Sequence, residues 1–218
     1  MTVNPVPTVP LWPLALLVSL WQTDFMDTTL PKKRERLSPQ QRREQLMQAA
    51  VTAYAQQGVE RAGHGDIAKL TSASTATVFN YFPTRGALTD AVLDYVSARI
   101  LAAMEIENAK EQDAVSVLSE LLSGFNNLIE TDPDVVKVIL NWSVSFGPAV
   151  RPSYLAYQDR VLTKLHSALG RTRTGQTSER SEARLIYAAA ISYATMKLDK
   201  SPEGVVSEYV KRVFGIFK

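Results

Sequence analysis

Short hydroxyl and amide side chains gather between residues 74 and 85, in a spacing that suits contact with nucleic acid. Ser74 precedes a helical pattern in which Thr75, Thr77 and Asn80 lie away from the apolar positions. Such groups hydrogen-bond to base edges and phosphates in a major groove, and an asparagine amide can form two bonds with an adenine edge. The pattern therefore predicts that Thr75, Thr77 and Asn80 contact bases or the floor of the groove.

The elements that must position these side chains have the outline of a helix-turn-helix. Ile67, Ala68 and Leu70 supply the apolar side of a short first helix, and residues 71 to 73 make the turn. Ser74 is expected to cap the second helix, because its hydroxyl can accept an unpaired backbone N–H. That helix is expected to end before Pro83, since the residue preceding a proline is pushed out of helical geometry. Its apolar face is expected to comprise Val78, Phe79 and Phe82.

Polar residues around this motif are expected at the DNA backbone. The predicted phosphate contacts are His64, Ser74, Tyr81, Thr84 and Arg85. Thr84 and Arg85 stand where another helix begins, and the exposed N–H groups of a helix start favour an anion. Other interpretations stand beside these: Ser74 can serve as a helix cap alone, and Tyr81 and Phe82 can belong to the core.

The string VFNYFPTR at residues 78–85 resembles the signature that closes the recognition helix of TetR-family transcription factors. The longer string GHGDIA at 63–68, followed by TATVFNYFPTR at 75–85, is similar to the LuxR/HapR-type master regulators of quorum sensing. The resemblance is strong over residues 37–95 and implies an all-α, TetR-like fold. Such a fold has an N-terminal three-helix helix-turn-helix domain and a C-terminal helical domain for dimerisation and ligand binding. Ser72 departs from the wider family, where the turn commonly contains glycine.

Residues that cap or break helices recur along the chain and support an all-α organisation. Ser38, Pro39 and Gln41 form a helix start with a serine cap, a proline in the first turn and a glutamine in capping-box register. That helix is expected to stop at Gly58, and another to run from about Arg85 past residue 100. Further helices are expected at about 112–131, 133–146, 149–169, 178–198 and 203–217. The predicted domains are an N-terminal extension (1–37), a DNA-binding domain (38–97) and a regulatory and dimerisation domain (98–218).

The N-terminal extension combines an apolar run with a basic arm. Residues 9–21 are apolar, but they are broken by two prolines and are shorter than the roughly 20 residues of a membrane span. We expect translation to begin at Met26, so that residues 1–25 are absent from the protein made in the cell. The arm contains Lys33, Arg34 and Arg36, which are expected to contact DNA because short arginine arms can enter a minor groove beside a helix-turn-helix. The alternative is a solvated tail.

Charge is distributed unevenly along the chain. Between residues 32 and 85 there are nine basic and four acidic residues, whereas the whole chain has a formal net charge of only +2. This asymmetry is typical of a basic DNA-binding end joined to a slightly acidic regulatory body.

The last two helices are the predicted homodimer interface. Small residues at 183, 188–190, 192 and 194 lie among larger apolar ones, so that two such helices could approach closely. The family resemblance implies a four-helix interface built from residues 178–217 of each subunit. The alternative is an alanine-rich helix buried within its own subunit. A dimer presents two recognition helices, which predicts a pseudopalindromic operator in double-stranded DNA with half-sites about one helical turn apart.

A ligand pocket is expected in the second domain. Aromatic and polar side chains there could line a cavity for an unidentified small molecule, although aromatic residues at helical spacing are more often core. The candidates are Met104, Phe125, Asn141, Trp142, Ser143, Phe146 and Tyr154, with Tyr157 and Tyr187 beside them.

Composition and motifs argue against several other functions. The chain has no cysteine, only two histidines and no glycine-rich phosphate loop, so neither a metal, a cofactor nor catalysis is expected. The resemblance to the LuxR/HapR-type regulators implies a cytoplasmic regulator that both activates and represses quorum-sensing promoters, and no membrane partner is expected. A ligand-relieved repressor of a neighbouring transporter or catabolic operon is the alternative.

Overall fold

The computed structural model describes residues 37–106, 112–170 and 180–217. These residues form nine α-helices and contain no strand, which confirms the all-α prediction. In chain order the helices are α1 (Pro39–Gln57), α2 (His64–Thr71), α3 (Thr75–Tyr81), α4 (Arg85–Ala103), α5 (Ala114–Thr131), α6 (Pro133–Ser143), α7 (Arg151–Gly170), α8 (Arg180–Leu198) and α9 (Glu203–Gly215).

Local hydrogen bonds set the helix starts that the sequence predicted. The Ser38 hydroxyl accepts the Gln41 N–H at 3.2 Å, and the Gln41 side chain accepts the Ser38 N–H at 2.9 Å, which completes the capping box of α1. Gly58 ends this helix with a φ of 85°, a conformation that favours glycine. The Thr84 hydroxyl caps α4 by accepting the Ala87 N–H at 3.1 Å.

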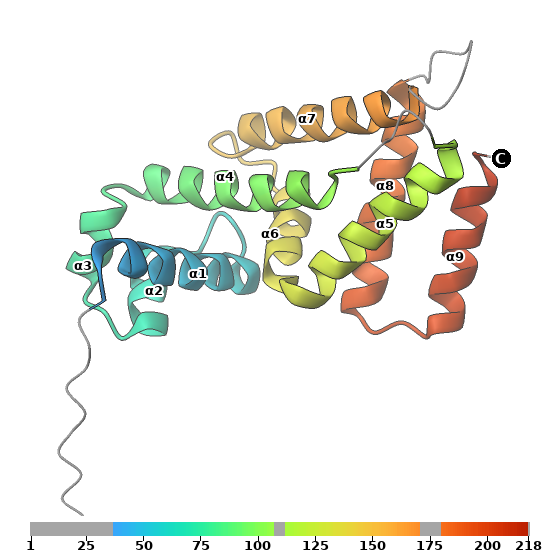
Figure 1. The fold of residues 1–218 in the computed structure, drawn as a ribbon. Coiled ribbons are helices and arrows are strands. Elements are labelled where there is room, and N and C mark those ends of the chain that lie inside the picture. The colour runs from blue at the N-terminus through green and yellow to red at the C-terminus, as the bar shows by residue number, and fades with distance from the viewer. Residues whose placement is uncertain (1–36, 107–111, 171–179, 218) are drawn as a thin grey trace, which may run out of the picture. The chain divides into compact units, whose positions relative to one another are not determined.

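Helices α1 to α3 make up the predicted helix-turn-helix unit (Figure 1). Helix α1 packs against α2, and α2 packs against α3. The side chains between them are almost completely buried. This core includes Leu46, Tyr54, Ile67, Val78 and Phe82, each at most 2% exposed.

Helix α4 leads from this unit into the remaining helices. It contacts α1 near its start and packs against α5 and α6 farther along, while α7 packs on α8 and α8 on α9. Together the helices form a single compact unit, Ser38–Lys218. Helix α4 runs without a break through residues 97 and 98. The boundary predicted there, between a DNA-binding domain and a regulatory domain, therefore stays a prediction.

Two helix ends differ from the predictions. Thr71 is the last residue of α2 and not part of the turn, and Ser72 follows in the left-handed conformation with a φ of 52°. A glycine would occupy this backbone conformation with less strain. Helix α6 ends at Ser143 and not at residue 146, because the Ser145 N–H bonds to the Trp142 carbonyl at 3.1 Å and tightens the chain ahead of Gly147 and Pro148.

Candidate nucleic-acid interface

Helix α3 has an exposed face and a buried face. Thr75, Ala76, Phe79 and Asn80 are exposed, and their spacing places them on the same side of the helix. Val78 and Phe82 lie on the opposite side in the core. The exposed face therefore offers a hydroxyl, a methyl group, an aromatic ring and an amide within two turns, without a charged side chain.

Ser74 and Thr77 bond to each other at the start of α3. The Ser74 hydroxyl accepts the Thr77 N–H at 3.1 Å, and the two hydroxyl oxygens are 2.8 Å apart. The predicted cap is thus present. Thr77 is half-buried, so Thr75 and Asn80 present their polar groups more openly than Thr77 does.

Phe79 does not belong to the apolar core face, and that prediction is wrong. Its side chain is 46% exposed, because Val78 and Phe82 already fill the space between α3 and its neighbours. One side of the Phe79 ring is covered by His64, with ring centroids 3.9 Å apart and the two planes within 8° of parallel.

His64 is buried and serves the fold of the motif. It is only 7% exposed, and its Nε2 lies 2.7 Å from the Phe82 carbonyl oxygen. A carbonyl can only accept, so Nε2 carries the proton. This bond ties the first residue of α2 to the end of α3. Burial between protein groups leaves His64 little surface for the predicted phosphate contact.

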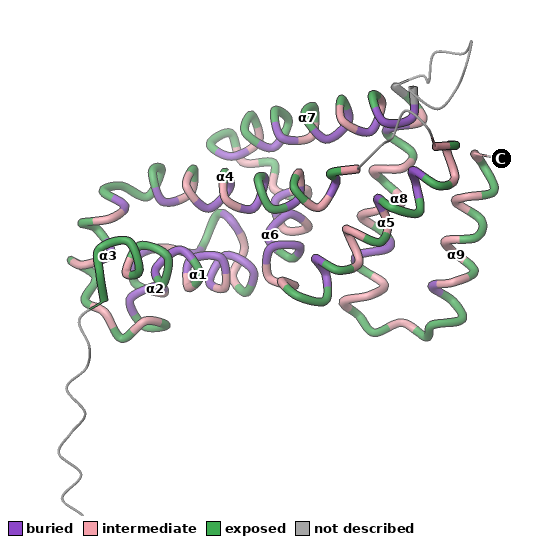
Figure 2. Tube along the Cα trace, viewed as in Figure 1, coloured by how far each residue is buried: buried purple, intermediate pink, exposed green. Residues whose placement is uncertain are grey.

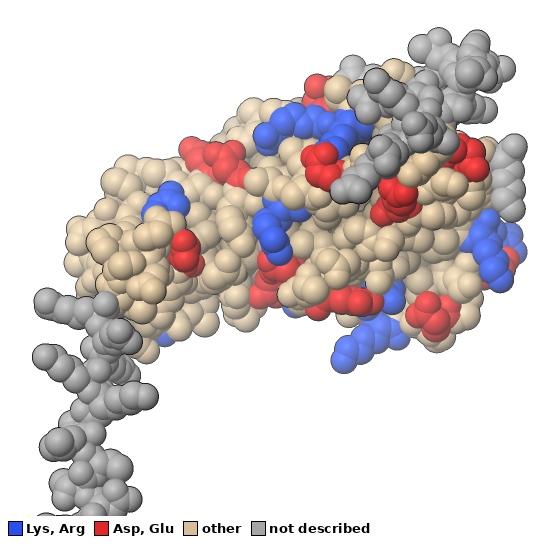
Figure 3. All heavy atoms as spheres, in the orientation of Figure 1, with Lys and Arg blue, Asp and Glu red and all other residues tan. Residues whose placement is uncertain are grey.

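Three of the other predicted phosphate contacts, Tyr81, Thr84 and Arg85, lie at the α3–α4 junction. Tyr81 is half-buried and packs against the core, whereas Thr84 and Arg85 are exposed. The Arg85 guanidinium donates to the Glu60 carbonyl, so it already has one partner within the protein. Lys33, Arg34 and Arg36 lie outside the described residues. Over α1 to α3, the face drawn in Figure 3 carries few charged side chains.

Helix α6 holds the C-terminal half of α1, a contact that the sequence did not predict. The Asn141 amide donates to the carbonyls of Ala55 at 3.0 Å and Tyr54 at 3.4 Å. The Thr52 hydroxyl donates to Asp134 at 2.9 Å. These residues are more than 80 positions apart in sequence, so no local pattern could have paired them.

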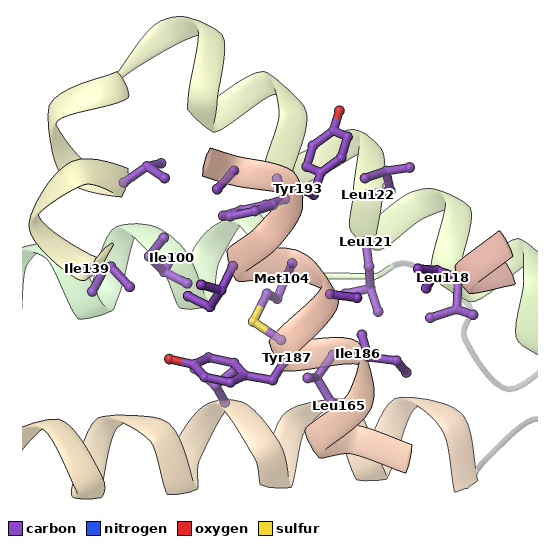
Figure 4. Close-up of a pocket in the computed structure, with 18 of the residues that line it drawn as sticks. Ile100, Met104, Leu118, Leu121, Leu122, Ile139, Leu165, Ile186, Tyr187 and Tyr193 are labelled. Carbon is purple, nitrogen blue, oxygen red and sulfur yellow. The ribbon is translucent and has the colours of Figure 1, made fainter. Parts of the chain in front are cut away.

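An apolar cavity of about 120 Å³ lies among α4 to α9 (Figure 4). Of the seven candidates for the pocket, only Met104 and Phe125 line it, together with Tyr157 and Tyr187. Most of the other lining residues are aliphatic, including Ile100, Leu118, Leu121, Leu122, Ile139, Leu165 and Ile186.

Five pocket candidates lie elsewhere. Asn141 binds α1, and the Ser143 hydroxyl donates to the Leu140 carbonyl at 2.7 Å. Trp142 is buried away from the cavity, with its ring 5.4 Å from that of Tyr157. Phe146 is 73% exposed, and the Arg151 guanidinium lies 4.3 Å from its ring centre. Tyr154 is buried beside Trp142, so its side chain belongs to the packed core and does not line the cavity.

Two of the tyrosines that line the cavity, Tyr187 and Tyr193, direct their hydroxyls outward. Tyr187 bonds to the Tyr154 hydroxyl at 2.8 Å, and Tyr193 donates to Asn126 at 2.7 Å. In Figure 4 both hydroxyls point away from the centre of the cavity. Burial raises the pKa of Tyr157 and of Tyr187, so both stay neutral at physiological pH. The cavity therefore presents hydrocarbon and aromatic surface without a charge.

The described ranges contain neither a metal-binding cluster nor a membrane-spanning helix. No group of three or more histidine, aspartate or glutamate side chains is placed to hold a metal ion there. Among those same residues, none of the helices is both long and apolar enough to traverse a bilayer.

The amino-acid sequence is similar to those of known proteins, a transcriptional regulator among them. No family model matches the chain. The chain is 35% identical over 130 residues to the HTH-type transcriptional regulator LuxR of Vibrio harveyi, a match that spans 60% of this chain and 63% of LuxR. It is 20% identical over 118 residues to the nucleoid occlusion factor SlmA of Haemophilus influenzae strain PittGG, covering 54% of each. The chain thus spans less than two thirds of the length of these relatives.

Solved structures share the fold at low sequence identity. A TetR-like transcriptional regulator from Rhodococcus sp. RHA1 superposes with a TM-score of 0.66 at 17% identity, covering 82% of this chain and 94% of that one. The transcriptional regulator FadR from Bacillus subtilis, solved in complex with stearoyl-CoA, gives a TM-score of 0.63 at 19% identity and covers 80% and 96%. LuxR and these two neighbours are transcriptional regulators. The chain therefore has the TetR-family regulator fold and is a relative of the transcriptional regulator LuxR.

Proposed function

We propose that this protein is a sequence-specific, DNA-binding transcriptional regulator. The observation that carries the proposal is the exposed face of α3, where Thr75 and Asn80 lie outside the core on a helix that packs against α2. Those two side chains contact base edges, with Asn80 directed to an adenine. Tyr81, Thr84 and Arg85 contact phosphates, which supply affinity and not sequence choice. The basic arm of Lys33, Arg34 and Arg36 enters the adjoining minor groove. Such a regulator works in the bacterial cytoplasm, where the chromosome lies.

The regulator acts as a homodimer through α8 and α9. Leu185 and Ala188 are exposed on one side of α8, Val205 is exposed on α9, and Ile216 is exposed directly after α9. Figure 2 marks exposed and half-buried residues along both helices. A second copy that covers these residues would remove apolar surface from water and present two recognition helices to a pseudopalindromic operator.

Replacing Asn80 with alanine tests the reading of bases. We expect the variant to lose about 1–3 kcal/mol of discrimination for its cognate site, because a bidentate amide–adenine contact has about that value. The measurement is fluorescence anisotropy with an operator selected from random duplexes and with an unselected duplex. Asn127, exposed on α5, provides the matched alanine control. Equal weakening on both duplexes would contradict base reading by Asn80.

The similarity to LuxR, together with the strings at 63–68 and 75–85, supports a role as a quorum-sensing master regulator that activates some promoters and represses others. DNA recovered with the protein from dense and sparse cultures should then differ in amount and should include promoters of both kinds. Recovery of a single neighbouring operon at every density would instead favour a dedicated repressor.

The apolar cavity favours that alternative, a repressor released by a ligand. Its lining selects an uncharged, apolar molecule, since no charged side chain lines it. The uncharged dye N-phenyl-1-naphthylamine is expected to fluoresce on binding there, and Ala190→Phe, which adds a ring to the lining, should reduce this signal several-fold. Ala102→Phe, exposed on α4, is the control. Equal dye binding by both variants would exclude the cavity as the binding site.

A further inference from the structure

The exposed ring of Phe79 is the one large apolar side chain on the outer face of α3. Its neighbours on that face, Thr75, Ala76 and Asn80, are small or polar. A phenylalanine left 46% exposed loses the stabilisation that burial would give it. Val78 and Phe82 already provide the buried contacts of this helix, so the fold does not require an aromatic residue at position 79.

The Phe79 ring is held in one orientation from behind. His64 covers one side of it at a centroid distance of 3.9 Å, and the His64 ring is itself fixed by the bond from Nε2 to the Phe82 carbonyl. Because His64 is 7% exposed, it has little freedom to move away. Phe79 is therefore a pre-organised apolar surface that loses little side-chain entropy when something packs on it.

The chemistry of a DNA groove leaves few partners for such a ring. Phosphates and most base-edge atoms require hydrogen-bond donors or acceptors, which a phenyl ring lacks. The C5-methyl group of thymine is the apolar group that a base pair exposes in the major groove, and phenylalanine is among the side chains that contact it. A cytosine at the same position has no methyl group there.

We propose that Phe79 reads a thymine methyl group in each operator half-site and that His64 positions its ring. This inference rests on the proposed DNA-binding function, and it adds a specificity determinant that forms no hydrogen bond to the base. Phe79 and Asn80 are neighbours on the same helix face, so the thymine lies within a base pair or two of the adenine that Asn80 contacts.

The test uses the full chain and removes single methyl groups from DNA. Duplexes that bind the wild-type protein are first selected from a random pool, and each thymine of the selected site is then replaced in turn by deoxyuridine. Loss of one buried methyl group corresponds to about a four-fold weaker affinity. We expect this effect at one thymine of each half-site, and about the square of it when both are replaced.

The same pair of duplexes is then measured with Phe79→Ala. This variant should bind the thymine and deoxyuridine sites with equal affinity, because the ring that senses the methyl group is gone. Leu70→Ala is the matched control, since Leu70 is also a large exposed apolar residue of the motif but lies on α2. It should keep the four-fold preference. If Phe79→Ala fails to fold by circular dichroism, Phe79→Gln serves in its place.

The positioning role of His64 is tested separately, through the preference for thymine over deoxyuridine. His64→Gln keeps a hydrogen-bond donor for the Phe82 carbonyl but removes the flat ring behind Phe79. We expect the thymine preference to fall while affinity for unselected DNA stays within two-fold, a pattern that loss of folding would not produce. An unchanged thymine preference would show that Phe79 holds its orientation without His64.

The outcomes separate this inference from the proposed function. If no sequence is enriched from the random pool, the DNA-binding proposal itself fails. If a sequence is enriched but no thymine is sensitive to methyl removal, or if Phe79→Ala keeps the preference, only the reading by Phe79 is overturned.

Discussion

The Leu185→Asp variant is expected to be monomeric and to bind its operator roughly 10²–10⁴-fold more weakly than the wild type. Leu185 is 55% exposed on α8, on the side that we propose meets a second copy. An aspartate there would have to be buried without a partner, which is costly. A monomer then binds a single half-site. It lacks the added affinity of a dimer, in which binding of the first subunit holds the second subunit at a high effective concentration beside the other half-site.

Sedimentation velocity and operator titration measure the two parts of this prediction. Leu155→Asp is the matched control, because Leu155 is 49% exposed but lies on α7. It should leave both the mass and the affinity unchanged. A Leu185→Asp protein that sediments as a dimer would place the interface on another surface.

The second large effect is expected at Trp142. Its replacement by alanine should lower the free energy of unfolding by about 3–5 kcal/mol, the usual cost of removing a large aromatic side chain from a core. Trp142 is 1% exposed, stacks on Tyr157, contacts the Tyr154 ring edge to face, and donates from Nε1 to the Val150 carbonyl at 3.1 Å. The cavity that remains would have no group able to collapse into it without moving α6 or α7.

Urea unfolding at matched protein concentration measures this loss, since the proposed dimerisation would make the apparent stability depend on protein concentration. Trp142→Phe keeps an aromatic ring and loses chiefly the Nε1 hydrogen bond, so it should cost about 1–2 kcal/mol. A loss below about 1 kcal/mol for Trp142→Ala would mean that the tryptophan is dispensable to the core.

Helix starts were predictable because the interactions that set them are local. The capping box joins Ser38 to Gln41, and the hydroxyls of Ser74 and Thr84 each accept an N–H three residues ahead. A cap of this kind depends on residue types within a single turn. The all-α fold and the helix-turn-helix could therefore be predicted from the order of capping residues, apolar positions and helix-breaking residues.

The direction in which a side chain faces was harder to predict where a helix is short. Val78 and Phe79 are adjacent, and a helix of seven residues has too few turns for its periodicity to decide which of them is buried. Packing against α2 decided it, placing Val78 in the core and Phe79 outside. His64, expected at a phosphate, was drawn inward by the Phe82 carbonyl and the Phe79 ring.

The cavity depended even more on tertiary structure. Its walls come from six helices, so membership depends on how α4 to α9 cross and not on any local pattern. Trp142 and Tyr154 were pocket candidates because they are aromatic, yet both lie in the packed core, whereas Met104 and Phe125 face the cavity.

The sequence by itself determined where helices begin, which helices are amphipathic and which segment carries groups able to read DNA, because these are properties of neighbouring residues. Only the tertiary structure decided which face of each helix is covered and where space remains, because burial is a property of all the helices that meet at one place.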